Sequence, residues 1–140
     1  MAVEKRAVVV WKGSLTEGSG SVSGASGAFS VEVSWPRRSE QGVEATSPEE
    51  LVAAAHASCF AMALSHELTQ GGHPPEELRV TATVGFQAGE GITGSHLDVR
   101  GEVVGIDAPG FDEAAAAAAE GCPVSKALSG VEITHSATLA

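Results

Sequence analysis

Two cysteines are the residues of this chain best suited to redox chemistry. Cys59 lies inside an alanine-rich apolar run, and Cys122 opens a Gly-Cys-Pro turn far downstream. An even pair is compatible with a structural disulfide, but the chain shows no secretory segment, and a cytosolic disulfide is more often catalytic than structural. We therefore expect a redox role and a cytoplasmic location.

A cysteine becomes a useful nucleophile only when nearby positive charge or hydrogen-bond donors stabilise its thiolate. The adjacent Arg37 and Arg38 are the candidates, because a guanidinium stays charged and can hold both a carboxylate and a thiolate or peroxide oxygen. A bidentate bond to Glu49 would fix the arginine that serves. The alternatives are that Cys59 is an inert buried thiol and that both arginines are solvated loop charges.

Glu49 and Cys59 cannot meet directly if both lie on one helix. Ten residues separate them, which is about 15 Å of helical rise. Either the arginine spans this distance, or the glutamate comes from an antiparallel copy of the helix in a second subunit. We favour the second arrangement and predict a twofold homodimer with sites at its interface.

Cys122 directly precedes a proline, in a position that resembles a helix N-cap. Unpaired N–H groups and the helix dipole favour an anion there, which would help this thiol react as a thiolate. We favour a role in resolving an oxidised Cys59 over that of a plain turn cysteine. Only the tertiary structure can tell whether the two sulfurs meet.

His56 lies one turn before Cys59 and offers a different chemistry. It could serve as a base in a Cys-His hydrolase, with Glu49 orienting the ring. We favour a hydrogen-bonded helix histidine, because no oxyanion-hole loop is evident. Without short Cys-x-x-Cys or His-x-x-x-His spacing, a zinc site and a thioredoxin-type dithiol are both disfavoured, and we expect neither metal nor cofactor.

The composition favours one domain over residues 1–140 and excludes several partners. Hydrophobic residues make up 43% of the chain, enough for a modest core that a second subunit would complete. With 18 acidic and 8 basic residues, the chain has no basic stripe and is an unlikely nucleic-acid binder. We see no apolar stretch near the roughly 20 residues that a membrane helix needs, and so expect no membrane partner.

One long helix must position Cys59. Ser47-Pro48-Glu49-Glu50 combines a capping box with proline at the first helical position, which predicts a helix from there to about Gln70, before two glycines. The first three turns are apolar almost all round. We therefore expect this helix to be central and buried on several sides.

Short strands surround the predicted helix. Before it we expect an antiparallel meander followed by a polar loop over residues 36–46, and after it two more strands, a helix, a helical turn and a last strand. This order indicates an α+β fold with antiparallel sheets around a long central helix. The expected strands are 6–12, 19–24, 28–35, 78–87, 96–104 and 131–139, with a loop at 88–94, a helix at 111–120 and the helical turn at 122–128.

Three stretches of the chain resemble the OsmC/Ohr family of thiol-dependent peroxidases, and in particular its OsmC branch. They are SPEEL at 47–51, AAAHASCFAMAL at 53–64 and GCPVSKAL at 121–128. The resemblance implies an α+β fold in which two chains intertwine, with a site at each end of the interface. It also implies that Cys59 is the peroxidatic thiolate, that Cys122 is the resolving thiol and that Glu49 holds the catalytic arginine.

The position of that arginine differs between the branches. In the Ohr branch it follows the glycine-rich second strand, where this chain has Gly18-Ser19-Gly20 and no arginine, so the OsmC-type arginine before the helix must serve. The local sequence departs from the family's Arg-Phe-Glu, and we choose Arg38, with Arg37 as the alternate.

The family implies an organic hydroperoxide as substrate and a dithiol reductant, such as a lipoyl-bearing protein. A Cys-His hydrolase and a non-catalytic acidic dimeric stress protein remain the competing functions.

Overall fold

The computed structural model describes residues 2–39 and 46–140, with the side chains of all of these except 37 and 39. Two three-stranded sheets, two longer helices and two short helices make up this part of the chain. In chain order the elements are β1 (Ala7–Lys12), β2 (Ser19–Gly24), β3 (Ser30–Val33), α1 (Trp35–Ser39), α2 (Pro48–Gln70), β4 (Glu77–Gln87), β5 (Gly91–Glu102), α3 (Ala108–Gly121), α4 (Pro123–Ala127) and β6 (Glu132–Leu139).

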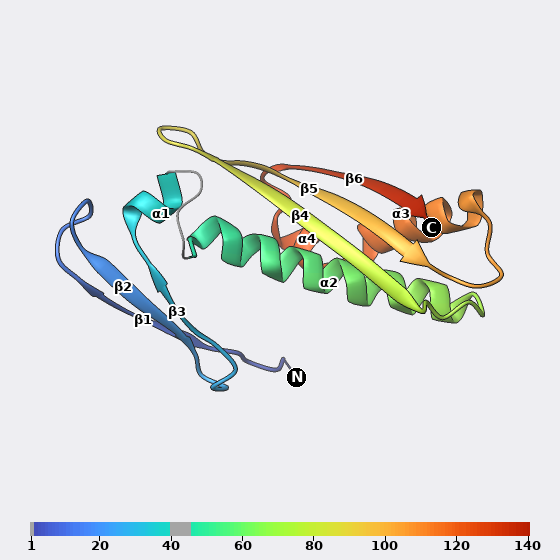
Figure 1. Ribbon diagram of the computed structural model, residues 1–140, viewed down its shortest axis with the longest axis horizontal. Helices are drawn as coiled ribbons and strands as arrows, with labels where there is room; N and C mark the ends of the chain where they lie inside the picture. The colour runs from blue at the N-terminus through green and yellow to red at the C-terminus, as the bar shows by residue number, and fades with distance from the viewer. Residues whose placement is uncertain (1, 40–45) are drawn as a thin grey trace.

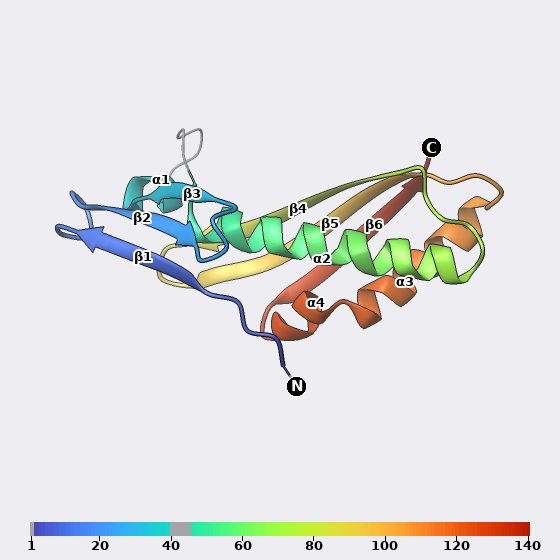
Figure 2. The same cartoon turned by 90° about the horizontal axis from the view of Figure 1, so that it is seen from below.

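The first three strands form the predicted antiparallel meander, in the order β1-β2-β3. In both views this sheet lies beyond the first turns of α2, while the second sheet runs along that helix (Figures 1 and 2). Every residue of β1 is exposed, including Val8, Val9 and Val10. The first sheet therefore leaves apolar side chains uncovered within one chain.

The second sheet has the order β4-β5-β6 and corrects one prediction. The pairing of β4 with β5 is antiparallel as expected, but β5 and β6 are parallel. Parallel neighbours need a crossover connection, and α3 and α4 supply it. The α+β class is confirmed, although this sheet is mixed where we predicted antiparallel pairing throughout.

Helix α2 begins and ends where its local sequence predicts. The Ser47 side chain accepts a hydrogen bond of 3.1 Å from the Glu50 N–H, and Pro48 occupies the first helical position. At the other end, Gly71 donates its N–H to Glu67, and Gly72 takes a positive φ that suits glycine. The capping chemistry is entirely local, which is why the sequence alone predicts these boundaries.

One face of α2 packs into the core, and this corrects the expectation that several faces are buried. The buried residues recur every four positions, at His56, Phe60, Leu64 and Leu68. They pack against inward side chains of β4 and β5 and against α3, whose alanines let the two helices approach closely. On another face of the helix, the Met62 side chain is 73% exposed, because no other part of the described chain covers that face.

Helix α2 also corrects the expectation about membrane spans. It is long and apolar enough, by length and composition, to cross a membrane. Within the single chain, 22% of its most apolar window is buried. The core helix of a globular domain meets the same criteria, so one such helix is weak evidence for a membrane span. Its buried stripe packs against protein and positions Cys59.

The structure differs from the prediction at two further points. Helix α1 occupies part of the predicted loop, because Pro36 suits the first turn of a helix and Arg38 donates its N–H to the Ser34 carbonyl. Residues 40–45 of that predicted loop lie outside the described part of the chain. Strand β5 begins at Gly91 because a tight turn replaces the predicted long loop, with positive φ at Gly89 and Gly91.

Gly101→Ala should destabilise the protein by about 1–3 kcal/mol, the usual cost of overpacking a core. A Cβ at this buried position would lie 2.5 Å from the Phe111 ring and 3.2 Å from Leu78. Gly121→Ala is the matched control, because no atom lies within 4 Å of its added Cβ. Urea unfolding should separate the two variants, and equal stability would contradict the described packing of α3 on β5.

Candidate active site

The fold brings the two cysteines together. Cys59 extends from the middle of α2 and Cys122 is the N-cap of α4. Both are free thiols, Cys59 packs against the buried cluster that includes Cys122, and each thiol shifts the pKa of the other. Cys122 is completely buried and Cys59 is partly exposed. A reagent from solvent therefore reaches Cys59 more easily than Cys122.

The backbone holds Cys122 rigidly at the junction of two helices. Its N–H donates to the Ala118 carbonyl at the end of α3, and its carbonyl accepts from the Lys126 N–H in α4. The residue is the N-cap of α4, as its place before Pro123 predicts. Its sulfur does not accept a full capping hydrogen bond, but the N–H groups of Val124 and Ser125 lie close enough to affect its ionisation.

The surroundings of the two sulfurs shift their pKa values in opposite directions. Burial, above all, raises the pKa of Cys59, and the neighbouring Cys122 raises it further, while a backbone hydrogen bond from Val124 opposes this. Burial would also raise the pKa of Cys122, but hydrogen bonds from the side chain and backbone of Ser125, from Cys59 and from Val124 lower it overall. Within one chain Cys122 is therefore the more acidic thiol.

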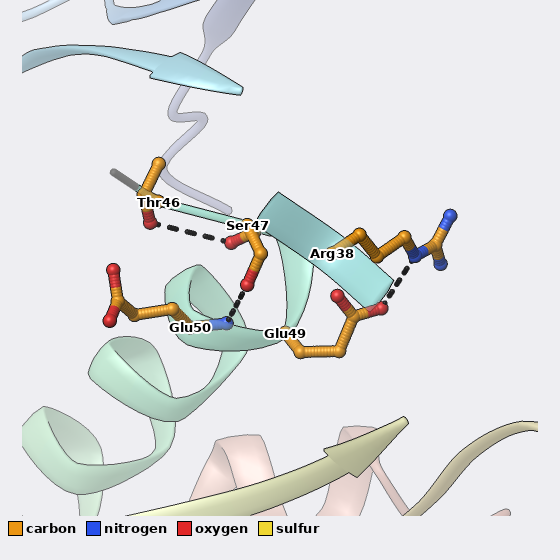
Figure 3. Close-up of polar contacts among 5 residues, drawn as sticks. All are labelled: Arg38, Thr46, Ser47, Glu49 and Glu50. Carbon is orange, nitrogen blue, oxygen red and sulfur yellow. Dashed lines mark hydrogen bonds and ion pairs between the residues drawn. The ribbon is translucent and has the colours of Figure 1, made fainter. Parts of the chain in front are cut away.

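Arg38 and Glu49 form the predicted ion pair at the start of α2, but through a single hydrogen bond in place of the expected bidentate one. The Arg38 Nε donates to Glu49 Oε1 at 2.8 Å, and the terminal guanidinium nitrogens point away from the carboxylate (Figure 3). The Arg38 guanidinium also lies 4.6 Å from the centre of the Phe86 ring. The side chain of Arg37, the alternate candidate, lies outside the described part of the structure.

The Glu49 carboxylate is buried with one oxygen satisfied. Its Oε2 has no hydrogen-bond partner among the described residues. Leaving a buried carboxylate oxygen without a donor is costly. The charge of Arg38 offsets this cost in part, and a further donor at Oε2 would offset more of it.

Within one chain the ion pair and the thiol pair lie at separate places along α2. About 15 Å of helical rise lies between Glu49 and Cys59, and Arg38 is held at the Glu49 end. Among the described residues, the groups that shift the pKa of Cys59 include no cationic side chain. One chain therefore contains both halves of the predicted site without joining them.

A largely apolar hollow of about 330 Å³ adjoins the ion pair. It lies between the first sheet and the start of α2, and its walls include Trp11, Leu15, Trp35 and Leu51 beside Arg38. The walls present aromatic rings and aliphatic side chains next to a guanidinium. Such a site suits a ligand with an apolar body and a polar or anionic group.

His56 is a hydrogen-bonded helix histidine, the interpretation that its sequence context favours over a catalytic base. It is completely buried, with Nδ1 2.6 Å from Ser95 Oγ and Nε2 2.7 Å from Ser125 Oγ, and burial lowers its pKa. Neither serine is among the residues predicted from the sequence. The spacing of Ser125, three residues after an N-cap, is a usable signal, whereas Ser95 reaches His56 only through the pairing of distant elements.

No group of three or more His, Cys, Asp or Glu residues that could hold a metal ion occurs within residues 2–39 and 46–140.

Several known proteins are similar to this chain. The family model described as OsmC-like protein matches residues 40–136. Peroxiredoxin OsmC of Escherichia coli (strain K12) is 39% identical over 96% of this chain and 95% of its own length. Among solved structures, the organic hydroperoxide resistance protein OsmC of Legionella pneumophila is 25% identical, with a TM-score of 0.73 and 99% of both chains covered.

The organic hydroperoxide resistance protein OhrB of Bacillus subtilis is 26% identical, with a TM-score of 0.68 over 96% of this chain and 98% of that one. The similarity to these three proteins extends over almost the whole length of this chain, while the family model begins after the first sheet. This chain belongs to the OsmC-like protein family.

Proposed function

We propose that this protein is a thiol-dependent peroxidase that reduces organic hydroperoxides, and hydrogen peroxide as well. The observation that carries the proposal is the packing of Cys59 against the buried cluster that includes Cys122, which brings together two free thiols from distant parts of the chain. The printed names of the relatives, peroxiredoxin and organic hydroperoxide resistance protein, support the same activity.

In the first step the Cys59 thiolate attacks the terminal oxygen of the hydroperoxide. The O–O bond breaks, the alkoxide leaves and takes up a proton to become the alcohol, and Cys59 becomes a sulfenic acid. The sulfur is oxidised and the peroxide is reduced by two electrons. Partial exposure of Cys59 supports its assignment as the thiol that meets the substrate.

In the second step Cys122 attacks the sulfenic sulfur and forms the Cys59–Cys122 disulfide, with loss of water. A dithiol then reduces this disulfide by thiol–disulfide exchange and is itself oxidised to a disulfide. We propose a lipoyl-bearing protein as a physiological source of the dithiol. Burial of Cys122 directs the incoming thiolate to the more accessible Cys59 sulfur.

Arg38 and Glu49 act, in this proposal, on the Cys59 of a second subunit. The pKa of Cys59 is raised within one chain, so this thiol needs a cation that the described residues of its own chain do not bring near. An antiparallel pairing of two α2 helices would place Arg38 of one subunit beside Cys59 of the other. The exposed valines of β1 and the exposed Met62 of α2 are apolar surface that such a dimer would cover.

The hollow beside Arg38 would receive the organic part of the hydroperoxide. Its apolar walls suit an alkyl or aryl group, while the terminal guanidinium nitrogens stay available for the peroxide oxygens. Glu49 holds the arginine through Nε and does not occupy those terminal nitrogens.

Catalytic turnover with a dithiol tests this function. With dihydrolipoamide as the electron donor, the wild-type protein should consume cumene hydroperoxide over many cycles and accumulate the internal disulfide when the dithiol runs out. Absence of turnover, together with a Cys59 that is alkylated no faster than a free thiol, would contradict the proposal. That result would favour a non-catalytic acidic protein, and esterase activity without a dithiol would favour the Cys-His hydrolase.

A further inference from the structure

A buried chain of hydrogen bonds links the second sheet to the thiol pair. Ser95 on β5 contacts His56 Nδ1 at 2.6 Å, and His56 Nε2 contacts Ser125 on α4 at 2.7 Å. The three side chains are each at least nine-tenths buried. Their partners are therefore fixed by the protein and not exchanged for water.

Ser125 connects this chain to Cys122. It lies three residues after Cys122 in the first turn of α4, where the side chains of the N-cap and third residues face each other. Its hydroxyl and its backbone N–H lie close enough to the Cys122 sulfur to lower the pKa of that thiol, although the sulfur accepts no full capping hydrogen bond. The imidazole of His56 is thus one hydroxyl away from the thiol that we propose as the resolving one.

We propose that His56 and Ser125 are positioning residues for the resolving step, in which His56 holds the Ser125 hydroxyl as a hydrogen-bond donor to the Cys122 sulfur. This inference rests on the proposed peroxidase function and assigns a role to a buried histidine that the mechanism leaves unused. His56 stays neutral in this role. Its Nε2–H donates to Ser125 Oγ, its Nδ1 accepts from the Ser95 hydroxyl, and the Ser125 proton is left to point at sulfur.

The resolving step balances without any further reactant. The Cys122 thiolate attacks the Cys59 sulfenic sulfur, the S–S bond forms and the S–O bond breaks, and the leaving hydroxide takes the proton that the Cys122 thiol has lost, giving water. The Cys122 sulfur is oxidised and the Cys59 sulfur is reduced. A thiolate becomes less nucleophilic as its pKa falls, but the Brønsted coefficient for this effect is only about 0.4–0.5. A donor that lowers the pKa of a weakly ionised thiol therefore still raises the rate, because the thiolate fraction increases more than the nucleophilicity decreases.

Few titratable groups of the described residues face the Cys122 sulfur. Cys59 on α2 affects its pKa, His56 reaches Ser125 beside it, and Lys126 on α4 and His135 on β6 are exposed. Lys126, His135 and Glu120 line an open hollow of about 410 Å³ that Ser125 also lines. A change in the titration of Cys122 after substitution of Ser125 therefore reports on the hydrogen bond and not on a lost charge.

Paired substitutions test the proposal. Ser125→Ala removes the donor and Ser125→Thr keeps a hydroxyl, while His56→Gln keeps an amide near the Nε2 position and His56→Asn keeps one near Nδ1. After one equivalent of cumene hydroperoxide, the lifetime of the Cys59 sulfenic acid should increase about tenfold or more in Ser125→Ala and in His56→Asn. Ser125→Thr and His56→Gln should resolve within about threefold of wild type.

A second measurement needs no peroxide. In a Cys59→Ser background, the ultraviolet absorbance of the Cys122 thiolate should appear at higher pH when Ser125→Ala is added, because the lost hydrogen bond stabilises the thiolate. Since this titration is independent of turnover, failure of the proposed peroxidase function and failure of this inference give different results. The first would abolish oxidation of Cys59, and the second would leave it intact.

Two results would overturn the inference. One is a Ser125→Ala variant that resolves its sulfenic acid at the wild-type rate with unchanged titration of Cys122. The other concerns Ser95→Ala, which removes a hydrogen bond of the same kind on the far side of His56. The inference fails if this variant slows resolution as much as Ser125→Ala does. That second outcome would mean that the three side chains only hold α2, β5 and α4 together and do not position the Ser125 hydroxyl for the resolving step.

Discussion

Cys59→Ser should lose at least about a thousandfold of the peroxide turnover, equivalent to about 4 kcal/mol of transition-state stabilisation. Serine keeps the shape of the side chain, but its hydroxyl stays protonated at neutral pH and cannot attack the O–O bond as a thiolate does. The measurement is consumption of cumene hydroperoxide with excess dihydrolipoamide. Ser58→Ala is the neighbouring control, because that exposed hydroxyl only donates back to the Ala54 carbonyl of its own helix.

Cys122→Ser distinguishes the proposed roles of the two thiols. This variant should still be oxidised once by peroxide at a rate near that of wild type, but its sulfenic acid should persist and no internal disulfide should form. If Cys122→Ser loses the first oxidation and Cys59→Ser keeps it, the roles of the two cysteines are reversed. The lower pKa of Cys122 within one chain makes this the informative alternative.

Arg38→Ala should reduce turnover about a hundredfold to a thousandfold, the usual loss when one preorganised donor to a developing charge is removed. Its guanidinium is fixed by Glu49 and Phe86, and its terminal nitrogens point away from the carboxylate, where we propose that they stabilise the thiolate and the peroxide oxygens. Arg38→Lys should recover little of this loss, because an ammonium cannot bind Glu49 through one nitrogen and present others to substrate. Steady-state kinetics on both variants would measure the loss.

Mixed dimers test whether Arg38 acts across the subunit interface. Arg38→Ala and Cys59→Ser chains, refolded together, should recover about one quarter of wild-type turnover, because half of the randomly paired dimers are mixed and each mixed dimer has one intact site of two. Light scattering in dilute buffer should give the mass of a dimer. A stable, active monomer, or a mixture with no recovered turnover, would rule out a site shared between subunits.

The local features of the fold were predictable because a few adjacent residues produce them. The capping box at Ser47 and the glycines after Gln70 define α2, and the alternation of β2 and β3 defines the meander. The ion pair of Arg38 with Glu49 was also predictable, since an arginine shortly before a buried helical acid has one strong partner within reach. The motifs around Cys59 and Cys122 are likewise contiguous stretches of chain, so the family is recognisable from the sequence alone.

The contacts between distant elements were decided by the tertiary structure. The parallel pairing of β5 with β6 depends on how α3 and α4 cross over the sheet, and this crossover also brings Cys122 to Cys59 and Ser125 to His56. A sequence pattern reports which residues lie on one face of an element, but not which face of another element covers it. The sequence by itself therefore determined the reactive residues and their helix, while packing of the crossover on α2 decided which of those residues meet.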